Sequence, residues 1–121
     1  MSFPLHRYRR LRRSESLRTM VRETSLAPSD FIAPLFVVPG QGVRQKVASM
    51  PGVDRTSPEL VGKDAKALAD LGVLSVILFG IPDHKDARGT SSADPEGPVC
   101  RAVKAIKAES PKTVVMTDIC L

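Results

Sequence analysis

The sequence predicts an α/β protein built on a parallel sheet, and three observations support this. Apolar runs typical of strands begin near residues 35, 73 and 113. Two segments with apolar residues at helical spacing separate these runs, so strand and helix alternate. The second apolar run is nearly continuous, as expected for a strand of a parallel sheet with both faces covered. This alternation predicts parallel strands joined by right-handed crossovers, which an open doubly wound sheet and a (β/α)₈ barrel both satisfy.

The first 27 residues are predicted to form an arm that precedes the sheet. Seven arginines lie within the first 22 residues, against one acidic residue, Glu15. Ser14 is placed to cap a short helix with one narrow apolar stripe at positions i, i+3 and i+4. The stripe consists of Leu17, Met20 and Val21. We therefore divide the chain into an arm over residues 1–27 and a domain over residues 28–121.

The first strand lies in the apolar run 31–38, which Pro39 and Gly40 end. Because proline has no N–H to donate to a neighbouring strand, Pro34 predicts that the strand proper begins near Leu35. The following segment, residues 41–56, is polar and rich in turn-forming residues. We predict a loop or a short excursion there.

Each predicted helix has recognisable ends. Ser57 and Pro58 supply an N-cap and a proline at the first helical position, and Gly72 is placed to end the helix in a left-handed conformation. The second helix stops before Pro111. The apolar face of the first helix is predicted to consist of Leu60, Val61, Ala65, Leu68 and Leu71. That of the second is predicted to consist of Val99, Ala102, Val103 and Ile106.

The second and third strands follow these helices. Residues 73–79 are almost continuously apolar, which predicts a strand covered on both faces. The third strand is predicted to begin at Thr113. Cys100 falls in the middle of the second helix, and we expect it in the core.

Composition narrows the possible classes of protein. With 42% hydrophobic and 26% charged residues, the chain resembles an ordinary globular domain. No apolar run approaches the length of a membrane helix, and no apolar stretch follows the basic N-terminus as it would in a secretory signal. We therefore predict a cytoplasmic protein with no membrane partner. Cys100 and Cys120 do not form the dense pattern of a secreted scaffold, so reduced thiols are expected.

The net charge of +5 is concentrated in the arm. Its arginines could neutralise phosphates, so a basic nucleic-acid-binding module is one interpretation. They could equally pair with carboxylates of a neighbouring subunit, because the guanidinium group binds a carboxylate through two hydrogen bonds. No recognisable nucleic-acid module accompanies the arm, and we predict no nucleic-acid partner.

Asp118 and Cys120 are the strongest candidates for chemistry. In parallel α/β folds, reactive groups gather at the carboxyl ends of strands, and residues two apart on a strand face the same side. A structural interpretation competes, because a lone cysteine is often a buried apolar residue and a strand-end aspartate often caps a loop. His84, Lys85 and Asp86 follow the second strand, but adjacent side chains do not converge on one atom. A small, non-catalytic α/β domain therefore stays open beside an enzyme.

The order of several segments resembles a known family. RYRRLRR, RTMVRETSLAPSDFIAPLFVVPG, SMPGVDR, LGVLSVILFGIPDHKD and TDICL resemble the N-terminal part of the 5-aminolevulinate dehydratases, also called porphobilinogen synthases. The resemblance covers essentially the whole chain. It implies about three βα units of a (β/α)₈ TIM barrel, preceded by an arm that wraps a neighbouring subunit in a homo-octamer. The implied reaction condenses two 5-aminolevulinate molecules to porphobilinogen with loss of water, in tetrapyrrole (haem) biosynthesis.

The resemblance also implies roles for two residues. Asp118 matches the family's catalytic aspartate, and Cys120 matches the first of three cysteines that bind zinc; magnesium is a further possible metal of the intact protein. The family's two Schiff-base lysines match no lysine here. One thiolate does not build a tetrahedral zinc site. We therefore expect a truncated chain that is inactive alone and that aggregates through an uncovered apolar face.

Overall fold

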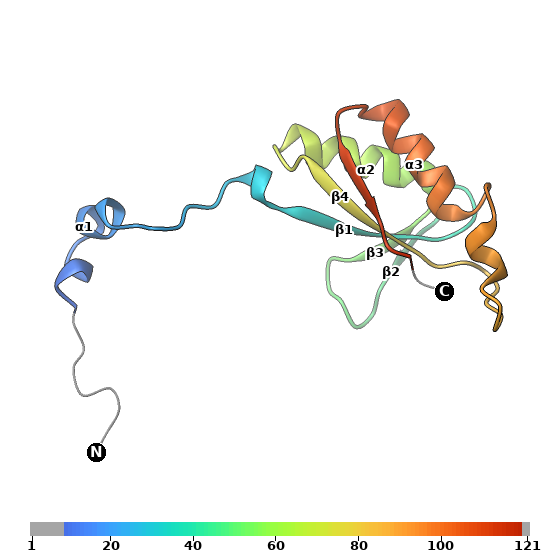
Figure 1. Cartoon of the computed structure of the whole chain (residues 1–121), viewed down its shortest axis with the longest axis horizontal. Coiled ribbons are helices and arrows are strands. Elements are labelled where there is room, and N and C mark those ends of the chain that lie inside the picture. The colour runs from blue at the N-terminus through green and yellow to red at the C-terminus, as the bar shows by residue number, and fades with distance from the viewer. Residues whose placement is uncertain (1–8, 120–121) are drawn as a thin grey trace, which may run out of the picture.

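The computed structural model describes residues 9–119, which contain a five-stranded sheet with two helices packed on it (Figure 1). The strands are β1 (Ile32–Val37), β2 (Arg44–Lys46), β3 (Asp54–Thr56), β4 (Ser75–Gly80) and β5 (Val114–Thr117). The α-helices are α1 (Glu15–Met20), α2 (Pro58–Asp70) and α3 (Pro98–Glu109), and the 3-10 helices are η1 (Arg10–Arg12), η2 (Pro28–Asp30) and η3 (Thr90–Ala93).

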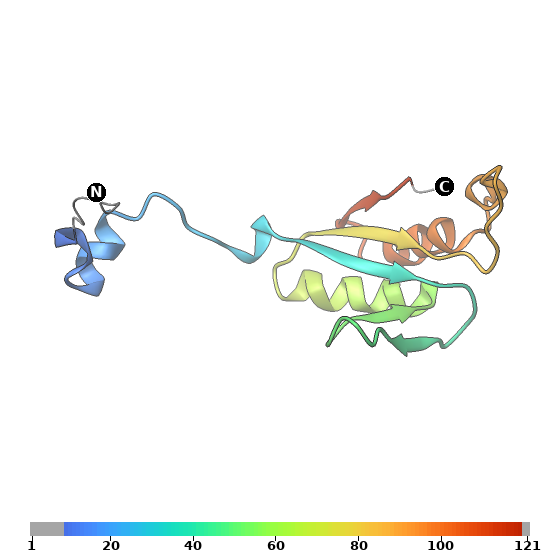
Figure 2. The same cartoon turned by 90° about the horizontal axis from the view of Figure 1, so that it is seen from below.

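The sheet has the strand order β2-β3-β1-β4-β5. β1 pairs in parallel with β3 and β4, and β4 pairs in parallel with β5; β2 alone runs antiparallel to its neighbour β3. α2 connects β3 to β4, and α3 connects β4 to β5 (Figure 2). The predicted α/β architecture with parallel crossovers is therefore confirmed.

The arm extends away from the sheet, and an extended stretch separates α1 from β1 (Figure 1). α1 begins after Ser14, whose Oγ accepts a hydrogen bond from the backbone N–H of Leu17 at 3.2 Å, as predicted. Met20 is 80% exposed. A role in wrapping a neighbouring subunit stays a prediction. Among the described residues, no helix combines the length and apolarity needed to cross a membrane.

β1 begins at Ile32 rather than near Leu35, so Pro34 lies inside the strand. The backbone N–H of Val38 donates to the carbonyl of Thr56 in β3 at 3.0 Å. Because N–H groups two residues apart point to the same side, the nitrogen of Pro34 also faces the β3 side. β3 pairs with only the last two residues of β1 and does not extend that far. Because β3 does not reach position 34, no backbone N–H donor is needed there, and the strand tolerates the proline.

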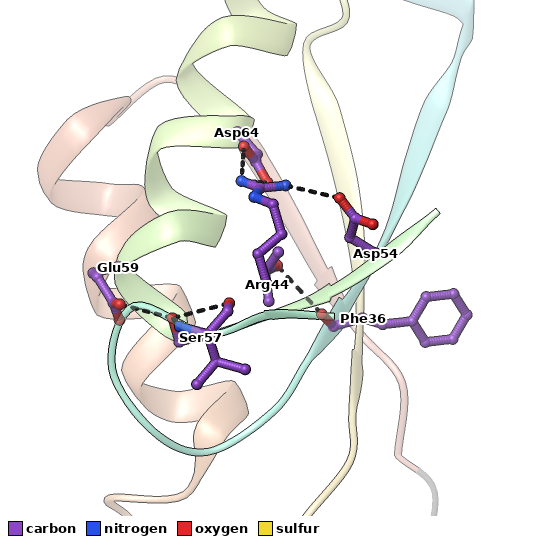
Figure 3. A network of polar contacts seen from close by, with 8 residues as sticks. Phe36, Arg44, Asp54, Ser57, Glu59 and Asp64 are labelled. Atoms are coloured by element: carbon purple, nitrogen blue, oxygen red, sulfur yellow. Dashed lines mark hydrogen bonds and ion pairs between the residues drawn. The ribbon is translucent and has the colours of Figure 1, made fainter. Parts of the chain in front are cut away.

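Segment 41–56, predicted to be a loop or short excursion, contains the strands β2 and β3. A polar network ties this hairpin to α2 (Figure 3). Two nitrogens of the Arg44 guanidinium reach carboxylate oxygens of Asp64 in α2 at 2.8 Å and of Asp54 in β3 at 3.3 Å. The hydrogen bond to Asp64 is the main reason that the pKa of Arg44 is raised. The hairpin was missed because its three-residue polar strands have no apolar periodicity.

The start of α2 carries the second half of this network. Ser57 occupies the predicted N-cap position, but its hydroxyl makes no capping bond to the helix backbone. Instead it accepts the N–H of Val43 at 3.0 Å and donates to the carboxylate of Glu59 at 2.7 Å. Glu59 also accepts the backbone N–H of Gly42. Both hydrogen bonds lower the pKa of Glu59 below its ordinary value, and the bond from Gly42 has the larger effect.

This lowered pKa predicts an acid-sensitive contribution to stability. The contribution is fully present above the ordinary pKa of 4.5 and is lost as the pH falls through the lower folded-state pKa. Glu59→Gln should therefore decrease the free energy of unfolding at neutral pH by at most about 1 kcal/mol, since solvent screens exposed groups. The difference between wild type and variant should shrink below pH 4.5, measured by urea unfolding followed by circular dichroism at a protein concentration low enough to avoid aggregation.

Asp70→Asn is the matched control, because Asp70 forms an exposed ion pair with Lys66. An acid dependence that is unchanged in Glu59→Gln, or equally changed in Asp70→Asn, would contradict the assignment.

The core lies between one face of the sheet and the two helices α2 and α3. Its fully buried members are Val37, Val61, Ala65, Val76, Leu78, Ala102 and Ile106. Gly62 lets the helices approach closely, since a Cβ there would lie 3.1 Å from the carbonyl oxygen of Ala105. Gly72 has a φ of +89°, as predicted for the end of α2. Leu71, predicted to be on the buried face, is 73% exposed because it follows the last helical residue and leaves the buried face.

The opposite face of the sheet is named here the inner face. It consists of Ile32, Pro34, Phe36, Ser75, Ile77, Phe79, Val114 and Met116, which alternate with the residues that face the helices. On β4, Val76 and Leu78 are buried, whereas Ile77 and Phe79 are only partly buried. The prediction that this strand is covered on both faces is therefore wrong for the described residues. Successive right-handed crossovers in one direction place both helices on the same side.

Candidate functional site

The carboxyl ends of β1, β4 and β5 meet at one edge of the sheet, because the three strands are parallel. Asp118 lies there, directly after β5. Its backbone N–H donates to the carbonyl oxygen of Leu78 in β4 at 3.1 Å, so the strand pairing continues through this residue. The edge is the one at which parallel α/β folds carry their reactive groups.

Asp118 is exposed. Within residues 9–119, no hydrogen bond or ion pair engages its carboxylate. The competing structural interpretation of this aspartate therefore has no contact to support it in the described part of the chain. The exposed side chain is accessible to a bound molecule.

A pocket of about 490 Å³ opens beside this edge. It lies between the end of β5, the start of α3 and the loop that connects β4 to α3. Asp94, Cys100 and Lys104 are among the residues that line it, and Asp118 borders it where β5 ends. The prediction that Cys100 lies in the core is wrong: its thiol is exposed, because it falls on the side of α3 turned away from the buried Ala102 and Ile106.

Lys104 is held by the loop rather than by Asp118. Its ammonium group donates to the carboxylate of Glu96 at 2.8 Å, and this bond raises the pKa of Lys104. Both side chains are more than half exposed, so the pair contributes little to stability. The lysine is therefore a charged group on the pocket wall.

The segment around His84 does not form an acid/base group. The carboxylate of Asp86 accepts the backbone N–H groups of Arg88 and Thr90, both at 3.0 Å. These hydrogen bonds lower the pKa of Asp86, and those from Thr90 have a larger effect than that from Arg88. His84 and Lys85 are exposed. Asp86 thus shapes the loop through these hydrogen bonds.

The second candidate, Cys120, lies outside the described residues. Within residues 9–119, no group of three or more histidine, cysteine, aspartate or glutamate side chains could hold a metal ion. A tetrahedral thiolate site needs several ligands at bonding distance. The described part of the chain therefore does not by itself provide a metal centre.

Two aromatic residues at the same edge were missed in the sequence. Phe36 and Phe79 are direct partners in the register of β1 and β4, and their ring centroids lie 5.5 Å apart. Each is the second-to-last residue of its strand. Figure 3 shows the Phe36 ring on the side of the sheet opposite α2. Both phenylalanines stand one residue before the end of their strand. This shared position was the signal that could have identified them as neighbours at one edge of the sheet.

Comparisons with known proteins point to one family along nearly the whole chain. Residues 5–121 match the family model for delta-aminolevulinic acid dehydratase. A protein of that name from Synechococcus elongatus is 51% identical over 119 residues, which is 98% of this chain and 36% of the relative. The corresponding protein from Bacillus subtilis is 46% identical over 121 residues, 100% of this chain and 37% of the relative.

A solved structure agrees with the fold. The crystal structure of delta-aminolevulinic acid dehydratase (porphobilinogen synthase) from Toxoplasma gondii, in complex with the reaction product porphobilinogen, superimposes with a TM-score of 0.84 at 31% identity. The match covers 99% of this chain and 35% of that one. The chain thus spans about a third of the length of these relatives. The predicted fold, the N-terminal part of a TIM barrel, is confirmed.

Proposed function

Since this chain belongs to the delta-aminolevulinic acid dehydratase family, we propose that it supplies the N-terminal third of a porphobilinogen synthase. The reaction is the condensation of two 5-aminolevulinate molecules to porphobilinogen with loss of two waters. The observation that carries this proposal is the match to the family over residues 5–121, with 51% identity to the Synechococcus elongatus relative.

Asp118 is the residue through which this chain acts in the proposed reaction. Asp118 is exposed at the carboxyl edge of the sheet, on the same side as Met116. There it would orient the amino group of a substrate or hold a proton in transit. The amine nucleophiles that form Schiff bases with the substrates would come from two lysines of later barrel strands, by resemblance to the family.

Zinc is the proposed metal of the assembled enzyme, and Cys120 is the proposed ligand from this chain. The described residues hold no ligand cluster of their own, so we derive no step of the reaction through the metal. When bound, zinc would supply Lewis-acid chemistry at a substrate oxygen. A further magnesium ion, the homo-octamer, the partner-wrapping role of residues 1–27 and the cytoplasmic location stay predictions.

A chimaera tests the proposal. Residues 1–121 are joined to the part of the Synechococcus elongatus relative that follows its matched region. If this chain supplies the N-terminal third of the barrel, the chimaera should convert 5-aminolevulinate to porphobilinogen, detected colorimetrically, whereas the chain alone should not. The chimaera should also retain zinc, and Cys120→Ser should reduce the metal content measured by atomic absorption. A folded, zinc-loaded chimaera without activity would contradict the proposal.

A further inference from the structure

We propose that Phe79 is a positioning residue that holds the side chain of Asp118 in its reactive orientation. The inference rests on the proposed function and extends it to a residue whose side chain has no reactive group. It is carried by the register of the sheet, by the aromatic pair on the inner face, and by the absence, within residues 9–119, of a hydrogen bond or ion pair to the Asp118 carboxylate.

The register places Phe79 directly beside Asp118. Leu78 is the partner of Thr117, and the N–H of Asp118 donates to the carbonyl of Leu78. The next pair in this parallel ladder is therefore Phe79 with Asp118. Neighbouring strands are about 4.8 Å apart, so the two side chains leave the sheet as adjacent groups.

Both side chains leave the sheet on the inner face. Val76 and Leu78 point into the helix-covered core, so Phe79 points the other way. On β5, Asp118 follows the inner-face residue Met116 by two positions and shares its side. Asp118 thus stands at the carboxyl end of the inner face, on the strand next to Phe79.

Phe79 is itself held in place by a neighbour. Phe36 is its partner on β1, with the ring centroids 5.5 Å apart and the ring planes tilted by 32°. Beyond Phe36, the register continues to Arg55 of β3. One row across the sheet thus runs from Arg55 through two packed aromatic rings to Asp118. In the proposed arrangement, the ring pair is the packing surface on the β4 side of Asp118 and limits the rotation of its side chain in that direction.

Packing against the ring pair is needed to orient the Asp118 carboxylate because, within residues 9–119, no polar contact holds it. A carboxylate without a hydrogen-bond partner is oriented by packing alone. Removing the ring at position 79 would give the side chain additional rotamers and admit water beside it. A misplacement of about 1 Å in a catalytic group costs about 10²-fold in rate.

A double-mutant cycle in the chimaera tests this inference. Phe79→Ala should lower kcat by about 10-fold to 10²-fold with little change in KM. In the Asp118→Asn background the same substitution should lower kcat by less than about threefold, because the residue acts through the aspartate. Phe79→Leu, which retains an apolar side chain, should recover most of the activity and serves if the alanine variant does not fold.

Ile77→Ala is the matched control. Ile77 lies on the inner face of the same strand, two residues before Phe79, and pairs with Met116 rather than with Asp118. It should leave kcat of the folded enzyme within about twofold, because Ile77 lies one row away from Asp118 and does not pair with it. An inactive unmutated chimaera would overturn the proposed function and this inference together. An active chimaera in which Phe79→Ala and Asp118→Asn have independent effects on kcat would overturn the inference alone.

Discussion

Asp118→Asn in the chimaera is expected to lower kcat by about 10²-fold to 10⁴-fold, the usual contribution of a positioned acid or base. Asparagine keeps the shape of the side chain and its ability to accept a hydrogen bond, but it cannot carry a proton or a negative charge. The fold should survive, because within residues 9–119 no hydrogen bond or ion pair depends on this carboxylate. Initial rates of porphobilinogen formation, divided by the folded enzyme concentration, give the result.

Asp94→Asn is the matched control for this experiment. Asp94 borders the same pocket, but its carboxylate accepts the backbone N–H of Glu96 at 2.9 Å, a bond that an asparagine oxygen also accepts. The control should leave kcat within about twofold, as for a substitution that preserves a local hydrogen bond. Equal decreases of kcat in both variants would indicate that the reaction needs negative charge in this region in general. Such a result would contradict the proposed role of Asp118.

Much of the fold could be predicted because periodic apolar patterns mark it directly. α2, α3 and β4 were each identified from the spacing of apolar residues together with end signals such as Pro58 and Gly72. Position 34 shows the limit of local rules. Whether a proline is tolerated depends on how far the neighbouring strand extends, and that length is a property of the sheet and not of the segment.

The errors in burial have a common cause. Cys100 and Leu71 were assigned to the core from their residue types and their places in or near a helix, yet both are exposed. A helix buries a stripe whose exact direction depends on the sheet below it, so apolar residues beside the stripe stay exposed. The inner face of β4 was misjudged for a similar reason, because sequence alone does not tell which neighbours cover a strand.

The candidate site was predictable only in part. Asp118 stood out as a charged residue at the end of an apolar run, and the structure places it at the carboxyl edge beside a pocket. Phe36 and Phe79 gave no such signal, since aromatic residues in strands are ordinary core residues. Their position beside Asp118 follows from the register of three strands that are far apart in the sequence.

Leu78→Ala is expected to destabilise the domain by about 2–5 kcal/mol, the usual cost of removing a large side chain from a packed core. Leu78 is fully buried on the strand between β1 and β5, in the core that the two helices cover. A loss of this size is a large part of the about 5–15 kcal/mol that stabilises a typical domain. Urea unfolding is measured at low protein concentration, because the exposed inner face favours aggregation. The urea concentration at the midpoint of unfolding should be lower by about 1 M or more in the variant.

Leu71→Ala makes the same chemical change at a residue that is 73% exposed. It should shift the free energy of unfolding by less than about 0.5 kcal/mol, as most surface substitutions do. Each variant loses the same side-chain atoms, so the comparison tests whether the cost depends on where the side chain lies. If Leu71→Ala were as destabilising as Leu78→Ala, the face with Leu71 would be buried in solution against another surface. The assignment of the core to the layer between the sheet and its two helices would then be incomplete.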